Sequence, residues 1–403
     1  RLNRCYESVV NVENTMTSQR RLLASLEGPI KVLAILLLLN CFFVSISLMG
    51  AFKEIGSGYG RELINTLAHN PFIGLFMGIL ITSIIQSSST TTSIVVGLVA
   101  GGALGDSPAQ AIELAIPIVM GSNIGTSITA TIVSLAHMNN PEEMKRAFSA
   151  AIVHDFFNVL CVLIFFPLQL ATNFLGHSAT FMTELLAGSG GVAFSSPIKL
   201  LVGPQKALMQ SMMTHDMAIK LVIYSTLVYA VFHTVQFISR RVCAGASSNS
   251  MFVVGSLLFG TVFAVSDVYS GVVFHHSTGT FVLSLAILFA SLVGFVKVMR
   301  SLVFERMEGL FHNVIFRTPA LGILFGMVVT ALVQSSSVTT SIAIPLAGAG
   351  IISIYQVFPY TLGANVGTTI TAILAALAGG QIAGLTVAFA HFLFNVFGII
   401  VVY

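Results

Sequence analysis

Two clusters of Gln and Ser, at matching positions in two similar stretches, are the residues of this chain best suited to bind an anion. Residues 70–94 read NPFIGLFMGILITSIIQSSSTTTSI and residues 318–342 read TPALGILFGMVVTALVQSSSVTTSI. Both clusters interrupt apolar runs, where a hydroxyl or amide without a partner costs several kcal/mol. We therefore expect these side chains to bind a ligand. The candidate residues are Gln86, Ser87, Ser88, Ser89, Gln334, Ser335, Ser336 and Ser337.

A Ser run at the start of a helix can hold an oxyanion without help from a basic side chain. The N-terminus of a helix presents free backbone N–H groups and a partial positive charge. Ser hydroxyls and Gln amide N–H groups add donors. Neither cluster has a Lys or Arg beside it, so co-bound cations must contribute the neutralising charge. The alternative is that these small polar residues only join membrane helices to one another.

Asp155 is the strongest single candidate to bind a cation. It lies in HDFFN, from His154 to Asn158, and the second copy of this motif reads HFLFN, with Phe392 in place of the Asp. A carboxylate in mid-membrane costs about 2.5–3.5 kcal/mol on insertion scales, which a bound cation would offset. The alternative is an ion pair with Lys145 or Arg146, more than two helical turns away.

Oxygen ligands for Na⁺ recur around two further matching motifs, GSNIGT at residues 121–126 and GANVGT at residues 363–368. Gly within an apolar helix favours a break that frees backbone carbonyls for a ligand. Interhelical hydrogen bonds or helix caps are the alternative role for the Asn side chains, and neutral packed rings are expected for His154 and His391. The residues predicted to line Na⁺ sites with Asp155 are Asn123, Thr126, Thr129, Asn158, Asn365, Thr368, Thr371 and Asn395.

The composition places these motifs in a membrane. The 403 residues are 55% hydrophobic and 8% charged, with a mean hydropathy of +0.93. Several apolar runs approach the ~20 residues that cross a bilayer. The first, residues 32–52, follows an Arg-rich head and is too long for a signal-peptide core. With so few charges, the basic clusters indicate membrane topology rather than nucleic-acid binding.

The order of the motifs predicts an all-α polytopic membrane protein built from two inverted-topology repeats. Each repeat contains a re-entrant helical hairpin, a broken transmembrane helix and a helix with the repeated His and Asn, such as the span at residues 147–170. About eight full spans are expected. Each repeat has three crossings and two more lie between the repeats, so the second repeat begins on the opposite side of the membrane and is inverted. Hairpins entering from opposite faces would bring the two QSSS turns together near the midplane.

We expect four regions along the chain. Residues 1–29 form a cytosolic N-terminal segment, and residues 30–170 form the first repeat, with its hairpin at 71–101. Residues 171–279 form a connector that begins with a polar stretch and contains two spans. Residues 280–403 form the second repeat, with its hairpin at 319–350.

At QSSS, GSNIGTS, HDFFN and their second copies, this chain resembles the type II sodium-dependent phosphate cotransporter family. The resemblance covers both repeats and implies Na⁺-coupled uptake of inorganic phosphate by alternating access, with both termini cytosolic. It implies phosphate at the QSSS turns and Na⁺ beside them, with no organic cofactor and no enzymatic activity. The family pattern that ends in an aspartate matches Ser149, Ala151 and Asp155, which implies electrogenic transport and adds Ser149 to the Na⁺ ligands.

Vertebrate-type members of this family carry a large, disulfide-linked loop between the two halves. The connection here, residues 170–196, is short and has no Cys. The chain therefore resembles a bacterial member, located in the inner membrane.

Other functions stay open at this point. A Na⁺-coupled carrier for sulfate or a carboxylate would use the same donors. An anion channel would need no coupling-ion site, so Asp155 and the paired turns favour a carrier. An intramembrane enzyme using His154 and Asp155 is disfavoured, because adjacent helix residues do not face each other.

Overall fold

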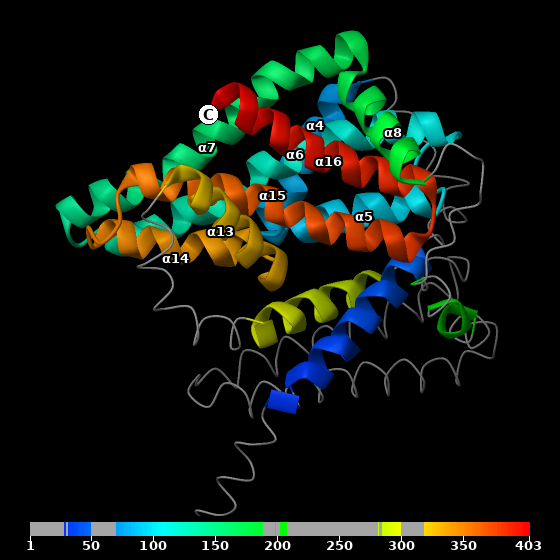
Figure 1. Cartoon of the computed structure of the whole chain (residues 1–403), viewed down its shortest axis with the longest axis horizontal. Coiled ribbons are helices and arrows are strands. Elements are labelled where there is room, and N and C mark those ends of the chain that lie inside the picture. Colours follow the sequence, from blue (N-terminus) through cyan, green and yellow to red (C-terminus); the bar gives the residue numbers. More distant parts are fainter. Residues whose placement is uncertain are drawn as a thin grey trace, which may run out of the picture.

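The described part of the chain is helical. A computed structural model describes residues 28–29, 31–49, 70–187, 198, 202–207, 281, 284–299 and 318–403 (Figure 1). Most of the predicted N-terminal segment and both spans predicted in the connector lie outside these residues. Within them, the all-α prediction is confirmed.

Two pairs of short helices stand where the hairpins were predicted, and each pair flanks one QSSS turn. At 1.5 Å per residue, helices of 15 and 13 residues reach about 22 and 20 Å, less than the ~30 Å hydrocarbon core of a bilayer. The first pair is α4 (Pro71–Ile85) and α5 (Ser88–Ala100), and the second is α13 (Pro319–Val333) and α14 (Ser336–Gly348).

The predicted breaks in the long helices are wrong. α6 (Pro108–Ser134) runs without interruption through Pro117 and GSNIGT. α15 (Ile354–Gly379) does the same through Pro359 and GANVGT. The backbone carbonyls of these two motifs are therefore committed to α6 and α15, and neither motif is unwound to supply ligands.

Close helix packing explains the glycines that suggested a break. A Cβ added at Gly121 would overlap the carbonyl oxygen of Leu75 in α4, and one at Gly363 would overlap that of Ile323 in α13. Small residues let the backbones of two membrane helices approach this closely. The Gly-rich motifs thus hold each hairpin against a long helix, α4 on α6 and α13 on α15.

The helices that carry the repeated His and Asn are α7 (Pro141–Thr172) and α16 (Ile382–Val402). α7 begins six residues before the predicted span, because the Asn140 side chain caps its first turn by accepting from the N–H groups of Glu142 and Glu143. A short 3₁₀ turn, η3 (Leu135–His137), lies between α6 and α7. α8 (Phe174–Ala187) occupies the stretch predicted as a polar connection.

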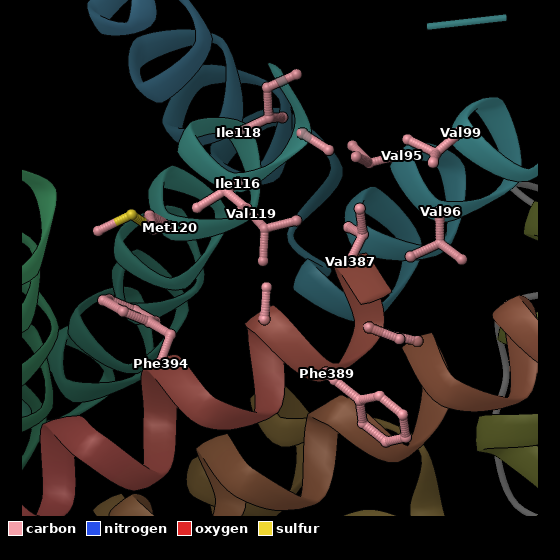
Figure 2. Close-up of a cluster of buried hydrophobic side chains, with 14 of the residues drawn as sticks. Val95, Val96, Val99, Ile116, Ile118, Val119, Met120, Val387, Phe389 and Phe394 are labelled. Atoms are coloured by element: carbon pink, nitrogen blue, oxygen red, sulfur yellow. The ribbon is translucent and has the colours of Figure 1, made fainter. Parts of the chain in front are cut away.

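The apolar core lies where helices from the two sequence repeats meet. Figure 2 shows Val95 and Val96 of α5, Val119 of α6, and Val387 and Phe394 of α16 gathered in one cluster. α5 also packs against α15, and α14 packs against α6 and α7. Each hairpin is therefore packed against helices of both repeats.

Five helices of the described residues are long and apolar enough to cross a membrane: 31–48, 108–137, 141–172, 354–379 and 382–402. The helix at 31–48 packs against the helix at 284–299 through Ala34, Leu38 and Phe295. This is the fold of a multi-pass helical membrane protein.

Candidate functional site

The two QSSS turns have the same backbone geometry. Gln86 ends α4 in the left-handed region, at φ 58°, and its N–H donates to the Thr82 carbonyl. Ser87 is extended and caps α5, accepting from the N–H of Thr90 at 3.2 Å. Gln334 (φ 59°) and Ser335 repeat this arrangement between α13 and α14. A left-handed residue followed by a cap reverses the chain in two residues, which is why each Ser run starts a helix.

Both Gln side chains are held by a Thr of the long helix behind them. The Thr129 hydroxyl of α6 donates to Gln86 Oε1 at 2.7 Å, and the Thr371 hydroxyl of α15 donates to Gln334 Oε1 at 2.6 Å. Each Gln Nε2 donates to a carbonyl of its own entry helix, that of Ser83 or Ala331. The Gln amides are therefore oriented by the protein, with Nε2 already engaged.

The two turns touch each other. The Ser337 hydroxyl of the second turn donates to the backbone oxygen of Gln86 in the first, at 3.3 Å. Ser337 and Gln334 are buried, whereas Gln86 is half-buried. The turns lie 251 residues apart in the sequence, so they are brought together by the tertiary fold alone.

The Ser residues at the start of α5 and α14 leave donors uncommitted. The first backbone bonds of these helices are made by the N–H groups of Thr91 and Thr339, so the N–H groups of the preceding Ser residues have no intrahelical acceptor. Among the described residues, no hydrogen bond engages the hydroxyls of Ser88, Ser89 or Ser336, although all three side chains are buried. These are the groups available to an oxyanion.

The four predicted Asn residues meet in one buried network that also contains both repeated His. Asn365 of α15 lies between His154 and Asn158 of α7, with bonds of 2.8 Å to each. Correspondingly, Asn123 of α6 lies between His391 and Asn395 of α16, at 3.0 and 2.8 Å. The six side chains are between 0% and 5% exposed. In this arrangement the Asn residues join helices of different repeats.

Asp155 lies outside that network, next to hydroxyls of α6. Its Oδ2 accepts from the Thr131 hydroxyl at 3.0 Å. Its Oδ1 is buried and has no hydrogen-bond partner among the described residues. An unsatisfied carboxylate oxygen in an apolar protein is a position suited to a cation.

The remaining predicted residues are placed differently. Thr126 and Thr368 donate to the carbonyls of Ser122 and Ala364 within their own helices. Ser149 is exposed, and its hydroxyl donates to the Lys145 carbonyl, so it is not gathered with Asp155. Thr131 was not predicted from the sequence, because Ser and Thr are frequent throughout these helices and only the packing of α6 against α7 selects it.

In the described part of the chain, long apolar helices enclose buried polar side chains, two matched QSSS turns in contact and the Asp155 carboxylate, and these features define the class as a multi-pass helical membrane protein with a polar interior. The Na⁺/Pi-cotransporter family matches this chain at residues 41–190 and 287–399. The chain belongs to this family.

Curated relatives agree with this assignment. Sodium-dependent phosphate transport protein 2B of Bos taurus is 33% identical over 95% of this chain and 60% of its own length. The Homo sapiens 2B protein is 32% identical, over 95% and 60%. Sodium-dependent phosphate transport protein 2A of Rattus norvegicus is 35% identical, over 93% and 61%. The chain thus spans about 60% of the length of these relatives. No solved structure matches it.

Proposed function

We propose that this protein couples inward Na⁺ flow to the uptake of inorganic phosphate by alternating access. The observation that carries the proposal is the contact between the two QSSS turns, made by Ser337 and the Gln86 carbonyl. Family membership and the names of the relatives, sodium-dependent phosphate transport proteins, support the same substrates.

Phosphate is proposed to bind between the two turns. The N-termini of α5 and α14 converge there and offer N–H groups and partial positive charge, together with the hydroxyls of Ser88, Ser89 and Ser336. A tetrahedral oxyanion has acceptor oxygens for donors from both sides. Ser87 and Ser335 act as helix caps, and Gln86 and Gln334 shape the turns.

Na⁺ ions are proposed to bind beside the turns, and Asp155 is the first candidate ligand. Its free oxygen and the Thr131 hydroxyl provide hard oxygen ligands in one place. The side-chain oxygen of each of the four Asn residues already accepts one hydrogen bond, so only its second lone pair is left to bind Na⁺. Because neither QSSS cluster has a Lys or Arg beside it in the sequence, the Na⁺ charge would favour phosphate binding, which is the physical basis of coupling.

The membrane arrangement is part of the same proposal. The two sets of helices are proposed to be inverted repeats, with re-entrant hairpins that enter from opposite faces and about eight full spans. Both termini are proposed to be cytosolic in a plasma membrane, and the short connection favours a bacterial inner membrane. The short hairpin helices and the meeting of their turns support this arrangement.

Uptake of radiolabelled phosphate into proteoliposomes, with and without an inward Na⁺ gradient, tests the proposal. We expect Na⁺-dependent uptake that sulfate does not compete away. Ser88→Ala and Ser336→Ala should each raise the KM for phosphate roughly tenfold, because each removes a hydroxyl donor to a charged ligand, worth about 1.5–3 kcal/mol.

Thr172→Ala, at the exposed end of α7, is the matched control and should leave the KM unchanged. Normal KM values in both Ser variants would refute the phosphate site. Equal uptake with and without the gradient would refute coupling.

A further inference from the structure

Two buried His residues, which the proposed ion sites do not use, end two hydrogen-bonded chains that run between the repeats. One chain joins α7 to α15 and the other joins α16 to α6. The direction of every bond in these chains can be derived, because each chain is anchored on a backbone carbonyl, which only accepts.

The first chain starts at the carbonyl of Asn123. Asn158 Nδ2 donates to that oxygen at 3.0 Å, so Asn158 Oδ1 faces Asn365 and accepts from its Nδ2 at 2.8 Å. Asn365 Oδ1 therefore faces His154 Nε2, also at 2.8 Å. Since this oxygen can only accept, His154 must carry its proton on Nε2.

The second chain starts at the carbonyl of His391 and leads to the same result. Asn395 Nδ2 donates to this carbonyl at 2.9 Å, and its Oδ1 accepts from Asn123 Nδ2 at 2.8 Å. Asn123 Oδ1 then accepts from His391 Nε2 at 3.0 Å. In both chains a His and an Asn one turn apart on one helix hold the Asn of the other repeat between them.

Both rings are in a neutral tautomer in this arrangement. The Nδ1 atoms of His154 and His391 are buried without a hydrogen-bond partner among the described residues. A second ring proton would add a buried donor with nothing to accept it, which is unfavourable. Each ring therefore acts as a single N–H donor, and its contribution is the placement of one amide.

Both Asn residues lie on the helices that hold the QSSS turns. Asn123 is six residues before Thr129, which orients Gln86, and Asn365 is six residues before Thr371, which orients Gln334. Six residues of helix correspond to about 9 Å along the axis. His391 of α16 is thus bonded to α6 close to the Thr that orients the first turn. His154 of α7 is bonded in the same way to α15, close to the Thr that orients the second turn.

We propose that His154 and His391 are positioning residues that set each QSSS turn from the opposite repeat. This role rests on the proposed phosphate transport, and it differs from direct ligand binding, since the ring hydrogen bonds go to Asn365 and Asn123 rather than to the turns. It makes the geometry of each half of the phosphate site depend on the other half of the molecule.

The first test is transport kinetics in proteoliposomes. His154→Leu and His391→Leu should each raise the KM for phosphate roughly threefold to tenfold, the range expected for one interhelical hydrogen bond in a membrane protein. His154→Gln, which keeps an N–H donor, should recover most of the change. His177→Leu, an exposed His on α8, is the control and should leave the KM unchanged. A lower maximal rate at constant KM in both Leu variants would indicate a purely structural role and overturn the proposal.

The second test does not depend on transport. Thermal unfolding of the purified protein in detergent, for His154→Leu, Asn365→Leu and the double variant, should show less than additive losses, whereas His177→Leu with Asn365→Leu should be additive. Additive losses in the first pair would show that the bond is absent and overturn the proposal. Failure of the unsubstituted protein to take up phosphate would overturn the proposed function instead, and the unfolding cycle would still decide whether the two repeats are joined here.

Discussion

At the scale of single residues, the two copies of the His and Asn motif differ in one charge. Asp155 has one oxygen bonded to Thr131 and the other buried without a partner in the described structure. The matching position of α16 is Phe392, so the second half has no equivalent carboxylate. We therefore expect Asp155 to make cation binding in the first half differ from that in the second.

We predict that Asp155→Gly lowers the charge moved per phosphate while uptake persists. The variant loses an anionic oxygen for Na⁺, and it also loses a carboxylate whose insertion into a membrane costs about 2.5–3.5 kcal/mol, so the amount of folded protein should be maintained. Simultaneous recording of current and phosphate uptake gives the ratio, and Phe392→Gly serves as the matched control. An unchanged ratio in Asp155→Gly would exclude this carboxylate from the coupling site.

At the scale of elements, the hairpins are held by backbone contact with the long helices. A Cβ at Gly78 would overlap the carbonyl oxygen of Ile118, and one at Gly326 would overlap that of Tyr360. One turn earlier on α4, a Cβ at Gly74 would make an ordinary contact of 3.4 Å with Pro117. Gly78 and Gly326 therefore determine how closely each QSSS turn approaches the long helix whose Thr orients its Gln.

We predict that Gly78→Ala and Gly326→Ala each reduce the free energy of unfolding by about 1–3 kcal/mol, the usual effect of overpacking a close contact. Gly74→Ala and Gly322→Ala, which have room for a Cβ, should change stability by much less. Unfolding temperatures measured in detergent with a thiol-reactive or intrinsic probe would decide this, and equal losses in the two pairs would argue against the close approach.

At the scale of the whole molecule, the two halves interlock, and α14 is held at both ends. Near its start, Ser337 donates to the Gln86 carbonyl, and at its end Arg146 Nε of α7 donates to the Gly348 carbonyl at 2.9 Å. A guanidinium at a helix C-terminus also interacts favourably with the helix dipole. α14 and α7 lie next to each other in Figure 1. Movement of α14 relative to the first half must break the hydrogen bonds made by Ser337 and Arg146.

We predict that Arg146→Met loosens the end of α14 and accelerates amide hydrogen exchange in residues 346–353. A hydrogen bond to a charged group contributes about 1.5–3 kcal/mol, and partial exposure of this one favours the lower end, so exchange should rise roughly tenfold. Lys145→Met, the neighbouring exposed base, should have little effect on the same peptide. Identical exchange in both variants would show that Arg146 does not hold α14.

The repeated QSSS, Gly-rich and His/Asn motifs were enough to predict the helical class, the short helices on either side of each QSSS turn and the family. Helix ends were less well predicted. α7 starts early because Asn140 caps it, and α8 forms in a stretch that looks like a polar connection. The same glycines that favour a break also favour close packing, and only a neighbouring backbone decides between these outcomes.

The sequence by itself determined which side chains are polar within apolar helices, since their cost in a membrane requires a partner or a ligand. The tertiary structure decided which of them are partners of each other. Asn123 bonds His391 and Asn365 bonds His154 across 268 and 211 residues, while Asp155 Oδ1 stays without a partner in the described structure. Pairings over such separations depend on how helices of the two halves pack, which no local pattern contains.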